Sequence, residues 1–172
     1  HTGIMALGGI PLQKKLYELS FPIAALNGIV NSENVGSIVR NCAAFGFPSL
    51  IYDKKTSSPY LRRAVRVSMG TVIDLDIYET DNLFTCLSRL VPQSELISCE
   101  ISDKALDINS YNFKKETILV FGSEGRGIDP EILEISRRIL YIPISKNVPS
   151  LNVAASSAVF MNNIRNQINR QP

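Results

Sequence analysis

Polar and glycine residues gather in three short segments of this 172-residue chain, and each segment could contact a ligand. The first is a polar turn at residues 31–34, ending at Asn34, followed by Gly36 and Arg40. At about 100° per residue of a helix, Arg40 lies on the Gly36 side, away from the centre of the apolar stripe. We expect the glycine to leave space beside the guanidinium group. The spacing alone fits a surface arginine with a capping asparagine equally well.

The second segment is glycine-rich and reads Phe121-Gly122-Ser123-Glu124-Gly125-Arg126-Gly127. Its glycines permit positive φ angles and close approach of the backbone to a ligand. The order G-x-x-G-x-G differs from the dinucleotide fingerprint, and the Lys-Ser/Thr ending of a phosphate-binding loop is missing. The segment therefore indicates either a nucleotide-like ligand held in another geometry or a plain glycine-rich turn.

The third segment, residues 142–152, contains Pro143 and Pro149, which stiffen it. Either Ser150 or Asn152 could cap the helix expected after it. The small residues at 153–158 permit close backbone packing against another segment or another subunit.

Predicted strands and helices alternate along the chain, so these segments fall where strands end. Strands are expected at residues 22–30, 49–52, 72–78, 95–101, 118–121 and 139–142, and helices at 34–45, 59–69, 81–90, 130–135 and 151–168. The alternation predicts an α/β fold with a mostly parallel sheet flanked by helices. Ligands of such sheets bind at the carboxyl ends of the strands.

Composition excludes several classes of protein. No apolar stretch reaches the roughly 18 residues of a membrane helix, and no secretory signal is visible, so we expect a cytoplasmic protein without membrane contact. Three scattered cysteines do not suggest a disulfide scaffold or a zinc site. The only histidine is His1, which makes histidine-based catalysis and a metal centre improbable.

A net charge of +2 does not by itself indicate a nucleic-acid partner. Five cations nevertheless lie close together, with no acid among them: Lys54, Lys55, Arg62, Arg63 and Arg66. They form either a solvated basic face or a patch that contacts phosphates.

Taken together and in order, the three segments resemble the signature motifs of the SpoU (TrmH-like) RNA ribose 2′-O-methyltransferases of the SPOUT superfamily. The matching positions are Asn34-x-Gly36-x-x-x-Arg40, residues 121–127, and residues 142–144 with 150–153. The resemblance covers about residues 20–170. It implies methylation of a ribose 2′-hydroxyl in structured rRNA or tRNA, with S-adenosylmethionine as methyl donor and no metal.

The resemblance also implies a fold and a cofactor site. The family's sheet carries a deep C-terminal trefoil knot, and its members are homodimers that pair through the knot region. Carried over by position, Gly122, Ile142 and Leu151 line the cofactor pocket, and Phe121, Ile144 and Ser98 are further expected cofactor-binding residues.

Roles in the reaction follow from the same resemblance. Arg40 is expected to bind the adjacent phosphate and to stabilise the forming alkoxide, because its very high pKa argues against a role as proton acceptor. Glu124 would orient Arg40 or a neighbouring group. Asn34, Ser150 and Asn152 would hold the loops and the ribose, and the five clustered cations would bind RNA together with Arg40.

Two other functions stay open, a SPOUT-type base methyltransferase and a catalytically silent RNA-binding module. Residues 1–15 fit no regular element and are expected to be a linker from an upstream RNA-binding domain, with the catalytic domain at residues 16–172. The opening residues His1–Ala6 resemble the linker of family members that carry such a domain, and the start without methionine suggests a processed chain or a fragment.

Overall fold

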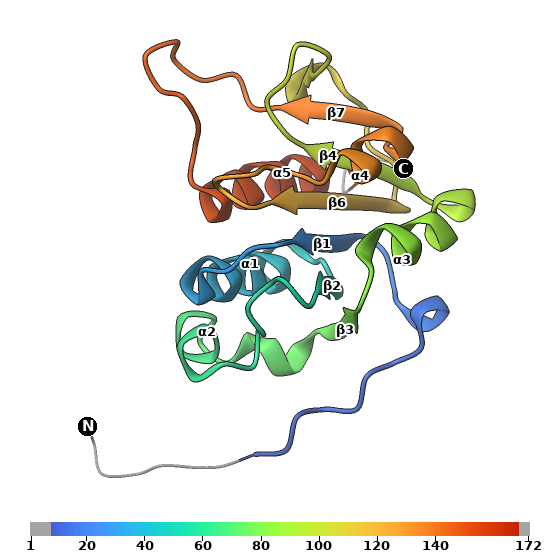
Figure 1. Cartoon of the computed structure of the whole chain (residues 1–172), viewed down its shortest axis with the longest axis vertical. Helices are drawn as coiled ribbons and strands as arrows, with labels where there is room; N and C mark the ends of the chain where they lie inside the picture. The colour runs from blue at the N-terminus through green and yellow to red at the C-terminus, as the bar shows by residue number, and fades with distance from the viewer. Residues whose placement is uncertain (1–7, 169–172) are drawn as a thin grey trace.

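The structure, a computed structural model, describes residues 8–168 and shows one parallel sheet with helices on both faces (Figure 1). The strands of this part of the chain lie in the order β3-β2-β1-β6-β4-β7-β5. Their bounds are β1 Ile23–Asn27, β2 Ser49–Asp53, β3 Asp76–Thr80, β4 Glu95–Cys99, β5 Leu106–Asp107, β6 Thr117–Gly122 and β7 Arg138–Tyr141. Every strand pair is parallel, which confirms the predicted sheet type.

Alternate residues of the central strands build two separate apolar layers. Helices α1 (Ser32–Phe45) and α5 (Val153–Ile168) cover one face, where Leu26 and Phe121 point. Helices α3 (Leu83–Leu90) and α4 (Pro130–Ile135) cover the other face, to which Ile23 and Val120 belong. Both faces of a central strand are thus buried, as the continuous apolar runs of a parallel sheet require.

Several element bounds differ from those that the sequence pattern predicts. Strand β1 ends at Asn27, because Gly28 turns the backbone into the left-handed region (φ 68°). Helix α2 spans only Arg62–Val67. The strand expected at residues 72–78 begins only at Asp76, because Thr71–Asp74 form a short 3-10 helix that buries Val72 and exposes the adjacent Ile73.

Helix ends are set by asparagines, some of them different from the expected caps. Asn82 caps α3 in place of Asp81, which instead forms an ion pair with Lys54. Helix α5 starts at Val153 and is capped by Asn152, one of the two candidates. Gly46 ends α1 in the left-handed conformation, as predicted.

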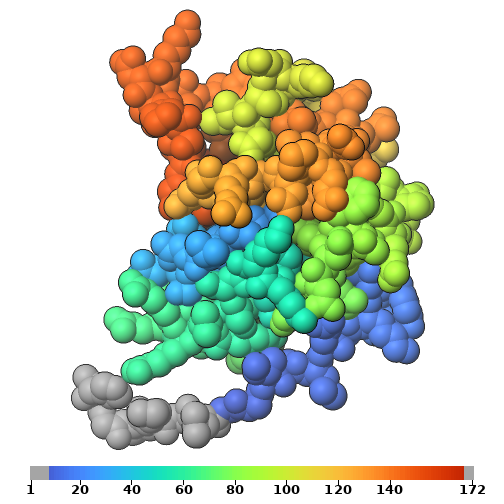
Figure 2. Space-filling model, viewed as in Figure 1, coloured from blue at the N-terminus to red at the C-terminus, as the bar shows by residue number. Residues whose placement is uncertain are grey.

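The carboxyl ends of the central strands meet at one edge of the sheet. Asn27 of β1 lies opposite Gly122 of β6, and Cys99 of β4 lies opposite Phe121. The segment between β7 and α5 leaves this edge and stands away from the body of the molecule (Figures 1 and 2). Within residues 8–168, no helix combines the length and the apolar character that crossing a membrane requires.

Candidate functional site

Three side chains from the three polar segments meet in one hydrogen-bonded cluster. Asn34 Nδ2 donates to Glu124 Oε1 at 3.1 Å, and Asn152 Nδ2 donates to the same oxygen at 2.7 Å. Asn152 Nδ2 also lies 3.0 Å from Asn34 Oδ1. Residues that are up to 118 positions apart in the chain are therefore held within direct contact.

The asparagines near the two helix starts differ in whether they cap a helix or bond to Glu124. Asn31, not Asn34, caps α1 by accepting a hydrogen bond from Glu33 N at 2.9 Å. Asn34 lies inside the first turn of α1, and its side chain is 7% exposed and directed to Glu124. Asn152 caps α5 and also bonds to Glu124: its Oδ1 accepts a hydrogen bond from Ala154 N, while its Nδ2 donates to Glu124 Oε1.

The glycine-rich segment between β6 and α4 is a tight loop that presents Glu124 at its tip. Ser123 and Gly127 pair through two backbone hydrogen bonds of 3.2 and 2.9 Å. A Cβ on Gly122 would come within 2.3 Å of the Gly127 carbonyl carbon, and Gly127 has φ 69°. Glycine is required at both positions for this loop to close.

A cavity opens beside the cluster, between the ends of β4, β6 and β7 and the start of α5. The space between these walls is about 680 Å³, including the open solvent at its mouth. Five of the six expected cofactor-binding residues line the cavity: Phe121, Gly122, Ile142, Ile144 and Leu151. Glu124 and Ser150 line it as well.

Ser98 is the exception among the expected cofactor-binding residues. Its side chain is fully buried, and its Oγ lies 2.7 Å from Ser136 Oγ, so it faces α4 and not the cavity. Alternation along β4 explains the difference, because successive side chains point to opposite faces of a sheet. Its neighbour Cys99 lines the cavity instead.

The cavity is also lined by residues that were not expected from the motifs, and a simple signal points to one of them, Glu100. Glu100 directly follows β4, and its carboxylate borders the cavity. A polar residue just past the carboxyl end of a parallel strand is a site candidate by position. Phe160 and Ser156 line the cavity from α5, and only the packing of that helix reveals them.

The cavity combines an apolar wall with few ionisable groups. Phe121 and Phe160 pack edge to face with ring centroids 6.1 Å apart. Burial raises the pKa of the Cys99 thiol well above its usual value, so this wall stays uncharged at neutral pH. Within residues 8–168, no three His, Cys, Asp or Glu side chains gather in a way that could hold a metal ion.

Arg40 lies on the exposed side of α1 and outside the cavity. In the described part of the chain its guanidinium forms neither a hydrogen bond nor an ion pair. The expected open space beside it is not what Gly36 provides, and this expectation was wrong. A Cβ on Gly36 would lie 2.5 Å from the Ala64 carbonyl oxygen, so the glycine lets α2 pack closely on α1.

The predicted basic patch is partly neutralised by acids from elsewhere in the chain. Lys54 pairs with Asp81, Lys55 with Asp129 at 3.2 Å, and Arg63 with Glu33 at 2.7 Å. A shallow hollow beside α2 gathers the remaining arginines with this last pair, and its lining is Glu33, Arg62, Arg63, Arg66 and Val67. The hollow adjoins the first turn of α1, which also carries Asn34.

Comparison with known proteins identifies relatives with the same fold. Residues 22–162 match the model of the SpoU rRNA Methylase family. The chain is 29% identical over 146 residues to the mitochondrial rRNA methyltransferase 1 of Dictyostelium discoideum, covering 81% of this chain and 28% of that protein. It is 26% identical over 139 residues to the 23S rRNA (guanosine-2′-O-)-methyltransferase RlmB of Acinetobacter baylyi, covering 80% and 56%. The chain thus spans about a quarter to just over half of these relatives' lengths.

Solved structures agree with the family match. The A. aeolicus TrmH/SpoU tRNA modifying enzyme superposes with a TM-score of 0.75 at 26% identity, covering 86% of this chain and 74% of that one. The SpoU methyltransferase AviRb of Streptomyces viridochromogenes, solved in complex with AdoMet, shares the fold with a TM-score of 0.80 at 20% identity, covering 90% and 63%. Because the family model matches most of the chain, this protein belongs to the SpoU rRNA methylase family.

Proposed function

We propose that this protein methylates a ribose 2′-hydroxyl in structured RNA, rRNA or tRNA, with S-adenosylmethionine as methyl donor. The observation that carries the proposal is the Asn34–Glu124–Asn152 cluster beside an open cavity. It joins all three segments that resemble the family's motifs at one edge of the sheet. The names of the relatives, which are rRNA and tRNA methyltransferases, support the same activity.

The cavity's shape and chemistry fit S-adenosylmethionine. Gly122 leaves no side chain on the β6 wall, Phe121 and Leu151 give apolar contact, and Glu100 is an acidic residue of the lining. When bound, S-adenosylmethionine supplies a methyl group activated by its sulfonium centre. The residues proposed to hold it are Gly122, Ile142, Leu151, Phe121 and Ile144, with Cys99 in place of Ser98.

The chain's own residues must orient the ribose and stabilise charge on its oxygen. Glu124 accepts two amide N–H groups, so the cluster keeps Asn34 and Asn152 in fixed orientation beside the cavity. Ser150 lines the same cavity and offers a hydroxyl. Arg40, exposed and unpaired among the described residues, is free to bind the neighbouring phosphate and to stabilise the nascent alkoxide.

The hollow beside α2 is proposed to contact the RNA backbone. Within residues 8–168, Arg62 and Arg66 form no ion pair, so both can neutralise phosphates. Lys54, Lys55 and Arg63 would exchange an exposed intramolecular carboxylate for phosphate. Such exposed pairs are weak, so the exchange costs little.

A homodimer and a C-terminal trefoil knot remain part of the proposal. The small residues at the start of α5 pack on α1 within the chain, where Asn41 Nδ2 donates to the Ala154 carbonyl and the Ser157 hydroxyl at 2.9 Å. Exposed apolar side chains on α5 and on the segment before it, Val148, Leu151 and Val159, support a partner surface. A monomer at tens of micromolar in sedimentation analysis would refute the dimer.

Selectivity for one RNA is proposed to come partly from an RNA-binding domain preceding the catalytic domain of residues 16–172, joined to it through residues 1–15. The greater length of the relatives supports this arrangement. Of the linker, the structure describes residues 8–15; Gln13 and Lys14 bond to β3 there, and residues 1–7 lie outside the described residues. The cytoplasmic location stays a prediction.

The test combines binding with product analysis. Calorimetric titration of S-adenosylmethionine in the presence of a chelator should give saturable binding, and the absence of heat and of a thermal shift at millimolar concentration would refute it. Methylated RNA is then digested with nuclease. A 2′-O-methyl ribose blocks cleavage at its own phosphodiester, whereas a methylated base leaves the bond cleavable. Cleavage there would favour the base methyltransferase, and binding without transfer would favour the silent module.

A further inference from the structure

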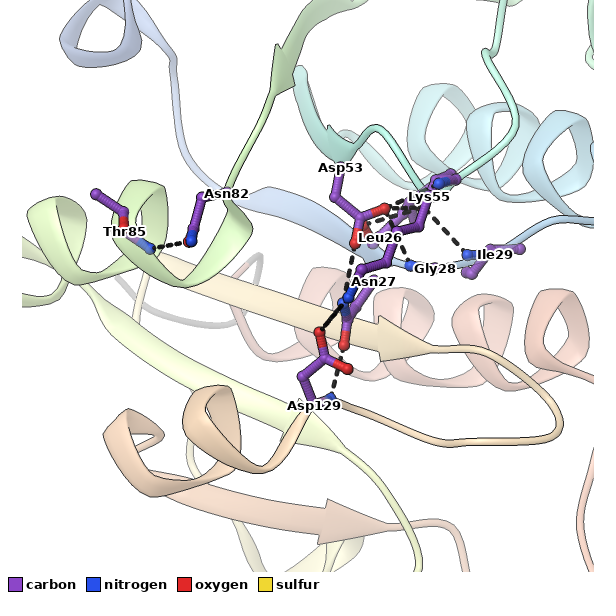
Figure 3. Close-up of polar contacts among 10 residues, drawn as sticks. Leu26, Asn27, Gly28, Ile29, Asp53, Lys55, Asn82, Thr85 and Asp129 are labelled. Atoms are coloured by element: carbon purple, nitrogen blue, oxygen red, sulfur yellow. Dashed lines mark hydrogen bonds and ion pairs between the residues drawn. The ribbon is translucent and has the colours of Figure 1, made fainter.

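A buried asparagine joins two carboxylates beside the end of the glycine-rich loop, where that loop reaches Asp129 (Figure 3). Asn27, the last residue of β1, is 2% exposed and lies opposite Gly122. Its Nδ2 donates to Asp53 Oδ2 at 3.0 Å and to Asp129 Oδ2 at 3.1 Å, and its Oδ1 accepts from Asp129 N at 2.7 Å. One amide therefore uses both of its N–H bonds and its oxygen to connect the ends of β1 and β2 with the residue before α4.

Asp53 anchors the side of this network that belongs to β1 and β2. Its carboxylate is 4% exposed, and its Oδ1 accepts from Gly28 N at 3.1 Å, Thr56 N at 2.9 Å and Thr56 Oγ1 at 2.8 Å. Thr56 Oγ1 in turn accepts from Ile29 N at 3.1 Å. Both oxygens of this buried carboxyl group are thus hydrogen-bonded, and they fix the backbone that leads from β1 into α1.

Asp129 anchors the side of the network that belongs to the glycine-rich loop and α4, and its side chain does not cap α4. It precedes Pro130 at the N-cap position of α4, yet its side chain forms no capping hydrogen bond. The carboxylate faces Asn27 and Lys55 instead, the latter at 3.2 Å. The hydrogen bond from Asn27 lowers the pKa of the Asp129 carboxyl, and Lys55 and Arg126 act in the same direction against a smaller opposing effect of burial.

The network holds the base of the loop whose tip carries Glu124. Two consecutive backbone N–H groups at the end of the loop are held by side chains from neighbouring strand ends: Ile128 N by Glu100 Oε2 at 3.1 Å, and Asp129 N by Asn27. At the tip, the side chain of Glu124 accepts hydrogen bonds from Asn34 and Asn152. A shift at the base therefore moves Glu124 relative to α1.

We propose that Asn27 is a positioning residue for the methyl-transfer reaction, locking the glycine-rich loop to the β1–α1 turn so that Glu124 meets Asn34 and Asn152. The reaction readout rests on the proposed function, but the structural readout does not. The amide is essential because it donates to two carboxylates at once. A carboxylate of the same shape would leave three acids facing one another.

The decisive variant is Asn27→Asp, which keeps the shape and replaces the donor with an acceptor. The introduced carboxylate faces Asp53 and Asp129, with Lys55 and Arg126 as the cations near them. At pH 8 we expect single-turnover methyl transfer to fall about 10²-fold, the loss that a displacement of about 1 Å causes in an active site. Like charges raise the pKa of the introduced group, so protonation near pH 5.5 restores one donor and should recover about tenfold of the loss.

A second substitution tests the same contact from the other side. Asp129→Asn in the Asn27→Asp background exchanges amide and carboxylate, so one N–H donor again faces one acceptor. The double variant should transfer methyl groups faster than the single variant at pH 8 and show a weaker pH dependence, because only Asp53 still places a like charge beside the introduced carboxylate. Asn41→Asp is the matched control, since Asn41 also loses a donor but its partners are a carbonyl and a hydroxyl. Its rate should recover less at low pH than that of Asn27→Asp, because no carboxylate lies among the partners of Asn41 to raise the pKa of the introduced group.

Amide hydrogen exchange at residues 123–128 provides a readout that needs no activity. Exchange should accelerate in Asn27→Asp and return toward the wild-type rate in the double variant. If Asn27→Asp does not fold, Asn27→Ser, which adds no charge but cannot span the contact, should still accelerate exchange there. Wild-type exchange in the serine variant, or an equal and pH-independent rate loss in single and double variants, would overturn the proposal. A wild-type protein that transfers no methyl group refutes the proposed function, while the exchange data still decide the role of Asn27.

Discussion

Gly122→Ala tests whether the closed glycine-rich loop is what shapes the cavity. The added Cβ would stand 2.3 Å from the carbonyl carbon and 2.4 Å from the carbonyl oxygen of Gly127, whereas ordinary contacts begin near 3.4 Å. The obstacle is backbone, so no side-chain rotation can relieve it. The two strands of the loop must separate by about 1 Å.

The energetic cost follows from what that separation breaks. The backbone pair between Ser123 and Gly127 consists of two hydrogen bonds, each contributing about 0.5–1.5 kcal/mol. Overpacking in well-packed regions costs about 1–3 kcal/mol, which agrees. At about 2–4 °C per kcal/mol for a chain of this size, the melting temperature should fall by several degrees.

Gly125→Ala is the matched control in the same loop. A Cβ there meets nothing within 4 Å, and its φ is not in the left-handed region. We expect calorimetry to show at least about tenfold weaker S-adenosylhomocysteine binding for Gly122→Ala, the equivalent of about 1.4 kcal/mol. The Gly125 variant should bind as the wild type does. Equal melting temperatures and affinities for the two variants would refute this account of the loop.

Further substitutions separate stability, cofactor binding and RNA binding. Arg40→Ala should leave the melting temperature and the S-adenosylhomocysteine affinity nearly unchanged, because the side chain is exposed, but it should lower single-turnover methyl transfer by about 10²–10³-fold. Arg40→Lys should recover little of the lost rate. Near-wild-type transfer in the alanine variant would exclude Arg40 from the mechanism. Glu33→Gln removes the exposed partner of Arg63. RNA affinity in a filter-binding assay should therefore rise by about 2–5-fold at low salt and stay unchanged at high salt. Weaker binding would contradict the proposed phosphate contact. Ser98→Ala should destabilise the fold by about 1 kcal/mol through its lost bond to Ser136 without changing cofactor affinity, and a large affinity loss would return Ser98 to the cavity wall.

The sequence by itself determined the sheet type and the three segments of the site. Continuous apolar runs and alternating helical patterns are local properties, so the parallel α/β architecture was predicted correctly. Asn34, Glu124 and Asn152 were named from their motifs, and five of six expected cofactor residues line the cavity. These features could be predicted because they depend on the type and spacing of residues that are close together in the sequence.

Tertiary structure alone decided which groups face one another. Gly36 was interpreted as room for Arg40, but it is the contact point of α2, whose Ala64 is 28 residues further along the chain. Ser98 and Cys99 differ by one position, and only the register of β4 shows which of them reaches the cavity. Three of the five cations in the basic patch form ion pairs with acids elsewhere in the chain. Asn27 carried no motif at all, because its role arises from two carboxylates that lie 26 and 102 residues away. Long-range contacts of this kind depend on strand order and loop closure, which no local pattern specifies.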